Sequence, residues 1–124
     1  MQKSPKISEA EWTVMKVVWK CPGLSAEDVI GHLASSSVWS PPTVKTLLNR
    51  LLGKKALRYE KKGKAYLYFP TFSEAEMKAA EADSFVDRIF DGSLSPMVSH
   101  FVKSGRLTED ELKELRRILR EGKG

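Results

Sequence analysis

Eight basic side chains lie between residues 40 and 70, with Glu60 as the single acidic residue among them. They are Lys45, Arg50, Lys54, Lys55, Arg58, Lys61, Lys62 and Lys64. Residues 1–70 carry 12 basic and 5 acidic side chains, a net charge of +7, whereas residues 71–124 carry 9 and 11, a net charge of −2. A cluster of this density is typical of a surface that binds a polyanion, although a solvated charge run has the same composition.

The residue types that catalyse reactions or bind metals are sparse. Cys21 is the single cysteine, which excludes an intramolecular disulfide and a clustered cysteine metal site, and fits a reducing cytoplasm. His32 and His100 lie in separate predicted helices without a nucleophile motif, phosphate loop or metal-ligand spacing nearby. We interpret them as surface or packing residues. We therefore expect no enzyme activity, no metal and no cofactor.

The length and composition suit one or two small cores: 124 residues, 41% hydrophobic and 30% charged. No apolar run approaches the roughly 20 residues of a membrane span, and the N-terminus lacks the apolar region of a signal peptide. We expect a cytoplasmic protein that does not bind a membrane directly.

Helix starts are marked by capping boxes, in which Ser or Thr is followed three residues later by Glu or Asp. Four such pairs occur, and a serine before a proline marks two further starts. The pairs are Ser8/Glu11, Ser25/Asp28, Ser73/Glu76 and Thr108/Glu111, and the two serines are Ser40, before Pro41, and Ser95, before Pro96. Six amphipathic helices are predicted.

Between the third and fourth helices, residues 56–60 and 65–69 alternate in the manner of two β-strands. Gly63 supplies the turn, so a hairpin with Lys61, Lys62 and Lys64 at its tip is expected. Tyr66 and Tyr68 would share one face of this hairpin as core or supporting residues. Trp12, Trp19 and Trp39 are interpreted as core packing rather than a ligand box.

Three helices followed by a lysine-tipped hairpin are typical of a winged helix-turn-helix, whose third helix enters the major groove of DNA. The fold class is therefore mainly α with a small β-hairpin, with a winged-helix DNA-binding domain at residues 1–71 and a three-helix dimerisation domain at residues 72–124. The last three helices have more apolar surface than they can bury among themselves, which predicts a homodimer. The predicted dimer residues are Phe85, Ile89, Phe90, Met97, Val98, Phe101, Leu112, Leu115 and Leu119.

The predicted third helix has two distinct faces. Val44, Leu47, Leu48 and Leu51 recur at helical spacing and form its buried face, whereas the opposite face is polar, basic and free of acids. Lys45 and Arg50 are candidates for guanine or phosphate contacts, and Thr46 and Asn49 for base edges or thymine methyls. The full predicted DNA-binding set is Ser40, Pro42, Thr43, Lys45, Thr46, Asn49, Arg50, Lys54, Lys61, Lys62 and Lys64.

Several stretches of the sequence resemble the penicillinase repressor family, the BlaI/MecI/CopY type of transcriptional repressors. They are Ile7-Ser8-Glu9-Ala10-Glu11-Trp12, residues 39–51 (WSPPTVKTLLNRL), residues 59–68 (YEKKGKAYLY) and residues 85–96 (FVDRIFDGSLSP), together with the leucine-striped last helix. The resemblance spans nearly the whole chain.

The resemblance implies a dimer that binds double-stranded operator DNA of palindromic sequence and represses transcription, as in regulators of antibiotic resistance. In the branch that responds to β-lactams, a membrane sensor protease system leads to cleavage of the repressor before a Phe. The corresponding bond here is His100-Phe101, with His where family members have Asn. The copper-responsive branch has clustered C-terminal cysteines, and residues 95–124 contain none, so copper sensing is not expected.

A winged helix that serves as a protein-interaction module, without specific DNA binding, is the alternative, because fold does not fix function. The acid-free face of the third helix argues against it. Steep loss of heparin or DNA retention with salt would discriminate the two.

Overall fold

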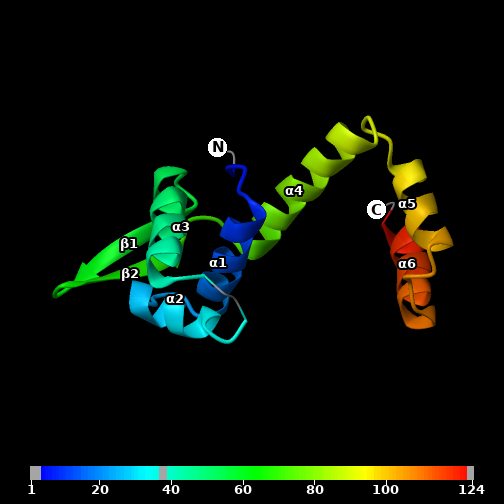
Figure 1. Ribbon diagram of the computed structural model, residues 1–124. Coiled ribbons are helices and arrows are strands. Elements are labelled where there is room, and N and C mark those ends of the chain that lie inside the picture. Colours follow the sequence, from blue (N-terminus) through cyan, green and yellow to red (C-terminus); the bar gives the residue numbers. More distant parts are fainter. Residues whose placement is uncertain (1–3, 37–38, 123–124) are drawn as a thin grey trace. The chain divides into compact units, whose positions relative to one another are not determined.

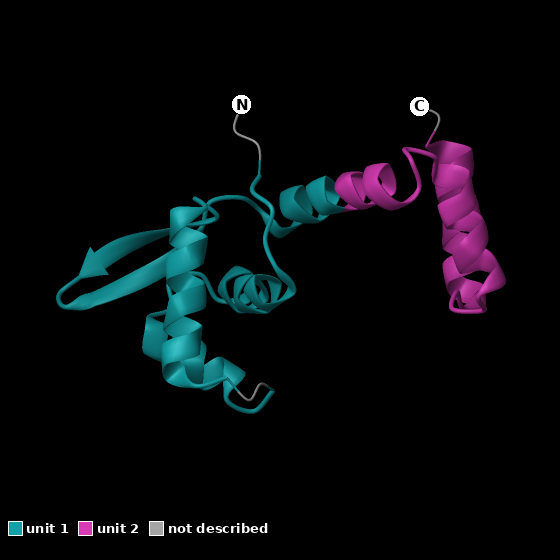
Figure 2. Ribbon diagram, turned by 45° about the horizontal axis from the view of Figure 1, so that its top comes forward, with its two compact units in different colours: residues 1–81 teal, residues 82–124 magenta. Residues whose placement is uncertain are grey.

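The computed structural model describes residues 4–36 and 39–122. The elements in chain order are α1 (Glu9–Lys20), α2 (Ala26–Leu33), α3 (Pro41–Gly53), β1 (Leu57–Lys62), β2 (Ala65–Pro70), α4 (Glu74–Ile89), α5 (Leu94–Lys103) and α6 (Glu109–Glu121). They form two compact units, residues 1–81 and 82–124 (Figure 2). The mainly helical fold with one hairpin is the one predicted.

The predicted capping boxes are confirmed, because in each box the two residues exchange backbone-to-side-chain hydrogen bonds. In α1, for example, Ser8 Oγ accepts from the N–H of Glu11 at 3.1 Å, and Glu11 Oε1 accepts from the N–H of Ser8 at 2.7 Å. The predicted start of α5 at Ser95-Pro96 is wrong by two residues, because the helix begins at Leu94 after the N-cap Ser93. A proline is tolerated in a first helical turn, whose N–H groups have no intrahelical partner.

In the first unit, α1, α2 and α3 pack against one another, and the hairpin projects away from them beside α3 (Figure 1). The buried apolar side chains of this core come from all three helices, the hairpin and α4: Val14, Met15, Val18, Val29, Leu33, Val44, Leu47, Leu48, Leu51, Ala56, Leu57, Tyr68 and Met77. Trp12, Trp19 and Trp39 pack against this core, as predicted. All four residues of the predicted apolar face of α3 are buried, so that helix is fixed to the core by one side only.

The hairpin is longer than predicted, because Lys61 and Lys62 pair with Tyr66 and Ala65 instead of belonging to the loop. Only Gly63 and Lys64 form the turn, and Gly63 has a φ of +62°, which is readily available to glycine at the first position of a two-residue turn. At the base, Leu24 bridges to Tyr68, with both backbone hydrogen bonds between residues 23–24 and Tyr68 at 2.8 Å. These bonds attach the hairpin to the segment before α2.

The second unit contains the end of α4, with α5 and α6. Among its described residues, 82–122, only Val86 is buried, at 8% exposure. Met77, in the part of α4 before this unit, belongs to the first core, and the chain passes from one unit to the other between residues 81 and 82. The domain boundary expected after residue 71 stays a prediction.

Candidate nucleic-acid interface

The exposed face of α3 carries the polar and basic residues that the sequence placed there. Its exposed members are Pro42, Thr43, Lys45, Thr46, Asn49 and Arg50, with Ser40 at the N-cap. Because Val44, Leu47, Leu48 and Leu51 fix the opposite side, all these residues are brought to one surface of one rigid helix. Such a helix can present several side chains in a fixed register to base edges.

The first turn of α3 favours an anion more than those of α1 and α2 do. Its N-cap Ser40 accepts from the N–H of Thr43 at 3.4 Å, and no acidic residue lies in the turn. By contrast, the first turns of α1 and α2 contain Glu9 and Glu11, and Glu27 and Asp28. The positive end of the α3 dipole is therefore left uncompensated by acids of its own first turn.

The hydroxyl of Thr46 is already engaged within α3. Its Oγ1 donates to the backbone oxygen of Pro42 at 3.0 Å, while the residue as a whole is exposed. The hydroxyl hydrogen is therefore used inside the helix, and an apolar contact through the methyl remains open to Thr46.

The hairpin tip forms a second basic surface of the same unit. Lys61, Lys62 and Lys64 are all exposed, and Lys64 lies in the two-residue turn itself. Lys62 shares the strand face of Arg58 and Glu60, whereas Lys61 shares the face of Tyr59. The three lysines therefore do not point in one direction.

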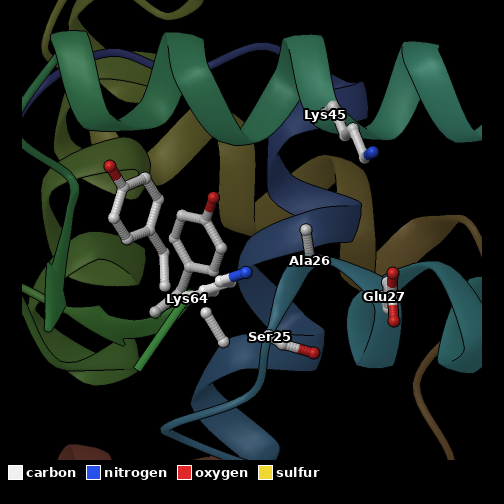
Figure 3. Close-up of a pocket in the computed structure, with 8 residues that line it drawn as sticks. Ser25, Ala26, Glu27, Lys45 and Lys64 are labelled. Atoms are coloured by element: carbon white, nitrogen blue, oxygen red, sulfur yellow. The ribbon is translucent and has the colours of Figure 1, made fainter. Parts of the chain in front are cut away.

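A hollow of about 360 Å³ lies between α3, the start of α2 and the hairpin. Lys45 comes from α3 and Lys64 from the hairpin, on either side of Ser25 and Ala26 (Figure 3). Glu27, Ala65, Tyr66 and Tyr68 complete its lining. The hollow thus joins the two basic surfaces, which the sequence analysis had treated separately.

Tyr66 is the residue of this region whose position sequence reasoning missed. It shares a hairpin face with Tyr68, as predicted, but Tyr68 is 6% exposed in the core whereas Tyr66 is 45% exposed. Burial raises the pKa of Tyr68, and the neighbouring Tyr66 raises it further, so Tyr68 keeps its phenolic proton near neutral pH. The sequence signal that could have indicated this exposure is the position of Tyr66 next to the hairpin tip, because a hairpin leaves the core toward its tip.

Lys54 has a partner within the protein. Its Nζ donates to Glu11 Oε1 at 2.6 Å and to the backbone oxygen of Lys6 at 3.1 Å. This contact joins the C-terminal end of α3 to the N-terminal end of α1. Lys54 was predicted to bind DNA; in this structure its ammonium group is paired with Glu11 while the side chain is 38% exposed, and its contact with DNA stays a prediction.

Glu11 is the buried member of this pair, at 1% exposure. Burial raises the pKa of Glu11, but the hydrogen bond and charge of Lys54 and the hydrogen bonds of Ser8 outweigh it, so the pKa lies below its usual value. Its Oε2 has no hydrogen-bond partner in the structure. Glu11 therefore remains ionised at neutral pH and depends on Lys54 for compensation.

Two further basic residues of the cluster have features that the sequence did not predict: Arg58 has side-chain contacts, and Lys55 has an unusual backbone conformation. Arg58 pairs with Glu60 at 2.9 Å and lies over the ring of Phe69, 4.7 Å from its centroid. Lys55 follows the end of α3 with a φ of +65°, a left-handed conformation in which a glycine is usual. Because Lys54 and Arg58 are paired with Glu11 and Glu60, the density of the cluster overstates the number of cations available to a ligand.

The predicted dimer residues all lie in the second unit, which includes the end of α4. Phe85, Ile89, Val98 and Leu119 are exposed by 37% to 63%, and Phe90, Met97, Phe101, Leu112 and Leu115 are partly buried. Leu94, Val102 and Ile118, outside the predicted dimer set, are also exposed. The His100-Phe101 bond lies inside α5, with His100 exposed and the two rings 5.2 Å apart.

The described ranges, 4–36 and 39–122, contain neither a metal-ligand cluster nor a membrane-spanning helix. No cluster of three or more His, Cys, Asp or Glu side chains there is arranged to hold a metal ion. Within the same ranges, no helix is long and apolar enough to cross a membrane.

Three packed helices and a lysine-tipped hairpin, with a polar and basic third helix exposed beside it, define a winged helix-turn-helix protein of the DNA-binding class. A model of the penicillinase repressor family matches residues 7–121. The chain therefore belongs to the penicillinase repressor family, as its sequence motifs predicted.

Curated relatives agree over the whole length. The chain is 40% identical over 123 residues to the penicillinase repressor of Bacillus licheniformis, covering 99% of this chain and 96% of the relative. It is 33% identical over 117 residues to the methicillin resistance regulatory protein MecI of Staphylococcus aureus strain N315, covering 94% and 95%.

Solved structures agree on the fold. The DNA-binding domain of the repressor BlaI has a TM-score of 0.55 at 43% identity, over 61% of this chain and 93% of that one. The monomeric form of Bacillus licheniformis BlaI in complex with the blaP half-operator has a TM-score of 0.54 at 43% identity, with the same coverage. The regulator MepR of Staphylococcus aureus, at 22% identity and a TM-score of 0.52, shares the fold over 94% of this chain and 77% of its own.

Proposed function

We propose that this chain is a sequence-specific DNA-binding transcriptional repressor that acts as a homodimer on a palindromic operator. The observation that carries the proposal is the acid-free exposed face of α3, fixed to the core by its apolar side. The relatives support it, because they are named as repressors and one is solved with a half-operator. Regulation of antibiotic resistance is the process that these relatives suggest, and the repressor would act in the cytoplasm, where it meets DNA.

We assign base recognition to α3 and backbone recognition to the hairpin. Lys45 and Arg50 would donate to guanine edges or phosphates, and Asn49 can hydrogen-bond a base edge. Thr46, whose hydroxyl is engaged by Pro42, would contact a thymine methyl through its own methyl. Ser40, Pro42 and Thr43 would lie beside the DNA at the N-terminus of α3, with Lys61, Lys62 and Lys64 on phosphates.

The second unit would supply the homodimer. Its apolar residues lie on exposed helix surfaces, and among the described residues only Val86 is buried, so a second copy of the chain is the partner that would cover them. Two copies related by a two-fold axis would place two α3 helices on a two-fold symmetric sequence.

Selection of bound sequences from random duplex DNA tests target, dimer and mode together. A two-fold symmetric consensus is the expected result. Sedimentation of the protein alone should show a dimer at micromolar concentration. A monomer at that concentration, together with a consensus lacking symmetry, would contradict the dimeric mode.

Alanine substitutions separate base recognition from backbone recognition. Arg50→Ala or Thr46→Ala should weaken binding to the selected consensus more than binding to a scrambled duplex. Lys62→Ala should weaken both equally and flatten the dependence of affinity on salt. Equal losses on both duplexes for all three variants would refute the assignment.

Proteolysis before Phe101 is the proposed route of induction, through a membrane sensor protease system that responds to β-lactams. The His100-Phe101 bond lies in α5, so the protease would require this helix to open locally before it could bind the chain in an extended form. Mass spectrometry of the repressor after β-lactam treatment of the native bacterium tests it. Fragments that end at His100 are expected, and an intact chain during induction would contradict this route.

A winged-helix module that binds protein without specific DNA binding is the second candidate. Two ion pairs, Arg58–Glu60 and Lys54–Glu11, are the observation in its favour. They leave fewer unpaired cations in the basic cluster than the sequence suggests. Such a module should elute from heparin and from nonspecific DNA without steep dependence on salt.

A further inference from the structure

The hollow between α3, the start of α2 and the hairpin lies where a DNA strand must pass if the proposed function holds. A helix in the major groove is flanked by the two sugar–phosphate strands that bound the groove. The hairpin is beside α3 in this unit, so one of these strands would run between them. The hollow, lined from both sides, lies on that path.

The lining suits one phosphate group. Lys45 and Lys64 supply an ammonium group from each side (Figure 3), and Tyr66 and Tyr68 are also among the lining residues. An anionic phosphate oxygen accepts hydrogen bonds from ammonium and phenolic groups, and such charge-assisted bonds are stronger than neutral ones.

Tyr66 differs from its neighbours in a way that points to a ligand contact. Its ring is 4.6 Å from that of Tyr59, and the two are similarly exposed, at 45% and 50%. Only Tyr66 of this pair lines the hollow. The ring of Tyr59 therefore packs against the ring of Tyr66 without lining the hollow itself.

We propose that this hollow binds one backbone phosphate of the DNA strand beside the major groove, and that Tyr66 donates its phenolic O–H to it between Lys45 and Lys64. The inference rests on the proposed function and adds Tyr66 to its DNA-contacting residues. It also gives Lys64, in the turn, a defined partner rather than a general electrostatic role.

Glu27 is also a lining residue of the hollow, and its negative charge opposes the binding of a phosphate there. The site therefore has two cations and one anion, and its affinity for an anion is held below what the lysines alone would give. Glu27→Gln should strengthen DNA binding by about threefold, as expected for removing one like charge from a wet site.

The direct test compares Tyr66→Phe with Tyr59→Phe in the full chain by fluorescence anisotropy on the selected consensus duplex and on a scrambled duplex. Tyr66→Phe should weaken binding about tenfold on both duplexes, because it removes a hydrogen bond to a charged group without reading sequence. Tyr59→Phe should change affinity by less than about twofold. Unchanged thermal unfolding of both variants controls for folding.

A methylphosphonate scan identifies the partner of Tyr66 on the DNA. Each phosphate of one strand is replaced in turn by a neutral methylphosphonate, and affinity is measured for the wild-type protein and Tyr66→Phe. One position should weaken the wild type strongly and the variant little, a non-additivity that a packing role would not produce.

The outcomes separate this inference from the function on which it rests. If the wild-type chain binds neither duplex, the proposed function and the inference both fail. If it binds and Tyr66→Phe binds equally well, or Tyr59→Phe loses as much as Tyr66→Phe, only the inference is overturned. Full additivity at every methylphosphonate position would overturn it as well.

Discussion

The two units of this protein bury their apolar side chains to very different extents. In residues 4–81, all three helices of the first unit, the hairpin and Met77 contribute to one core. In residues 82–122, Val86 alone is buried, and Leu94, Ile89 and Leu119 are more than half exposed. The first unit closes an apolar core within one chain, whereas the second leaves most of its apolar side chains exposed or only partly buried.

This difference in burial explains why the exposed basic residues of the first unit are held in fixed positions. A closed core lets the first unit expose Lys45 and Arg50 on a helix whose position does not depend on another molecule. The second unit, residues 82–124, carries eight acidic and eight basic side chains, so it lacks the basic excess of the first unit. Its helices would be stabilised mainly by what covers their exposed apolar side chains. If the proposed function holds, DNA recognition belongs to a unit that closes its own core, and dimerisation to a unit that is completed on assembly.

The largest expected effect is on the first core. Leu48→Ala, at a side chain with 0% exposure, should lower the free energy of unfolding by about 2–5 kcal/mol, the range for such cavity-forming changes. Urea denaturation followed by circular dichroism measures it. A loss below about 1 kcal/mol would contradict a closed core in this unit.

In the second unit, a leucine truncation should affect assembly instead of monomer stability. Leu119 is 63% exposed, so Leu119→Ala should leave the unfolding of dilute protein unchanged and weaken the dimer about tenfold or more, as two such side chains are lost per dimer. Sedimentation equilibrium measures the dissociation constant. Lys103→Ala, at an exposed polar position of α5, is the control and should leave it unaltered.

The first unit was largely predictable because its signals are local. The caps at Ser8 and Ser25 and the apolar spacing of α3 each depend on neighbours within a few residues. The exposed polar face of α3 followed from the same periodicity. The dimer face of the second unit, the DNA contacts of α3 and the hairpin, and the domain boundary after residue 71 stay predictions.

What the sequence did not predict depends on contacts between distant segments. The Glu11–Lys54 pair joins residues 43 apart, and the bridge of Leu24 to Tyr68 forms only once the helices are packed. The hollow at Tyr66 has the same origin, because its walls come from three elements. Periodicity specifies which side of an element is buried, but not which residues of other elements meet there.

The two units also differ in how much their ion pairs should contribute to stability. Glu11→Gln should lower the stability of the first unit by about 1–2 kcal/mol, because Lys54 loses its charged partner but can be rehydrated at 38% exposure. Arg117→Ala removes the exposed pairs with Glu114 and Glu121 in α6, and the midpoint of unfolding should stay the same.

The Glu11–Lys54 pair predicts that stability depends on pH. Because the pKa of Glu11 is depressed in the folded state, its contribution is complete above the unfolded value, near 4.5, and is lost as the pH falls through the folded value. Wild type and Glu11→Gln should therefore differ at pH 7 and converge in acid. Parallel stability curves down to pH 2 would exclude this role.

The smallest expected effect concerns the junction between α3 and the hairpin. Lys55 has a φ of +65°, while the N–H groups of Lys55 and Ala56 donate to Leu52 and Leu51 at 3.0 and 2.9 Å, so the helix ends in a motif that usually carries glycine at this position. Lys55→Gly should stabilise the first unit by about 0.5–1 kcal/mol, since relief of the left-handed strain outweighs the added flexibility of the unfolded chain. Lys55→Ala keeps the strained β-carbon and should give no such gain. If both variants stabilise equally by urea denaturation, removal of the lysine charge from the basic cluster, rather than the backbone conformation, is the cause.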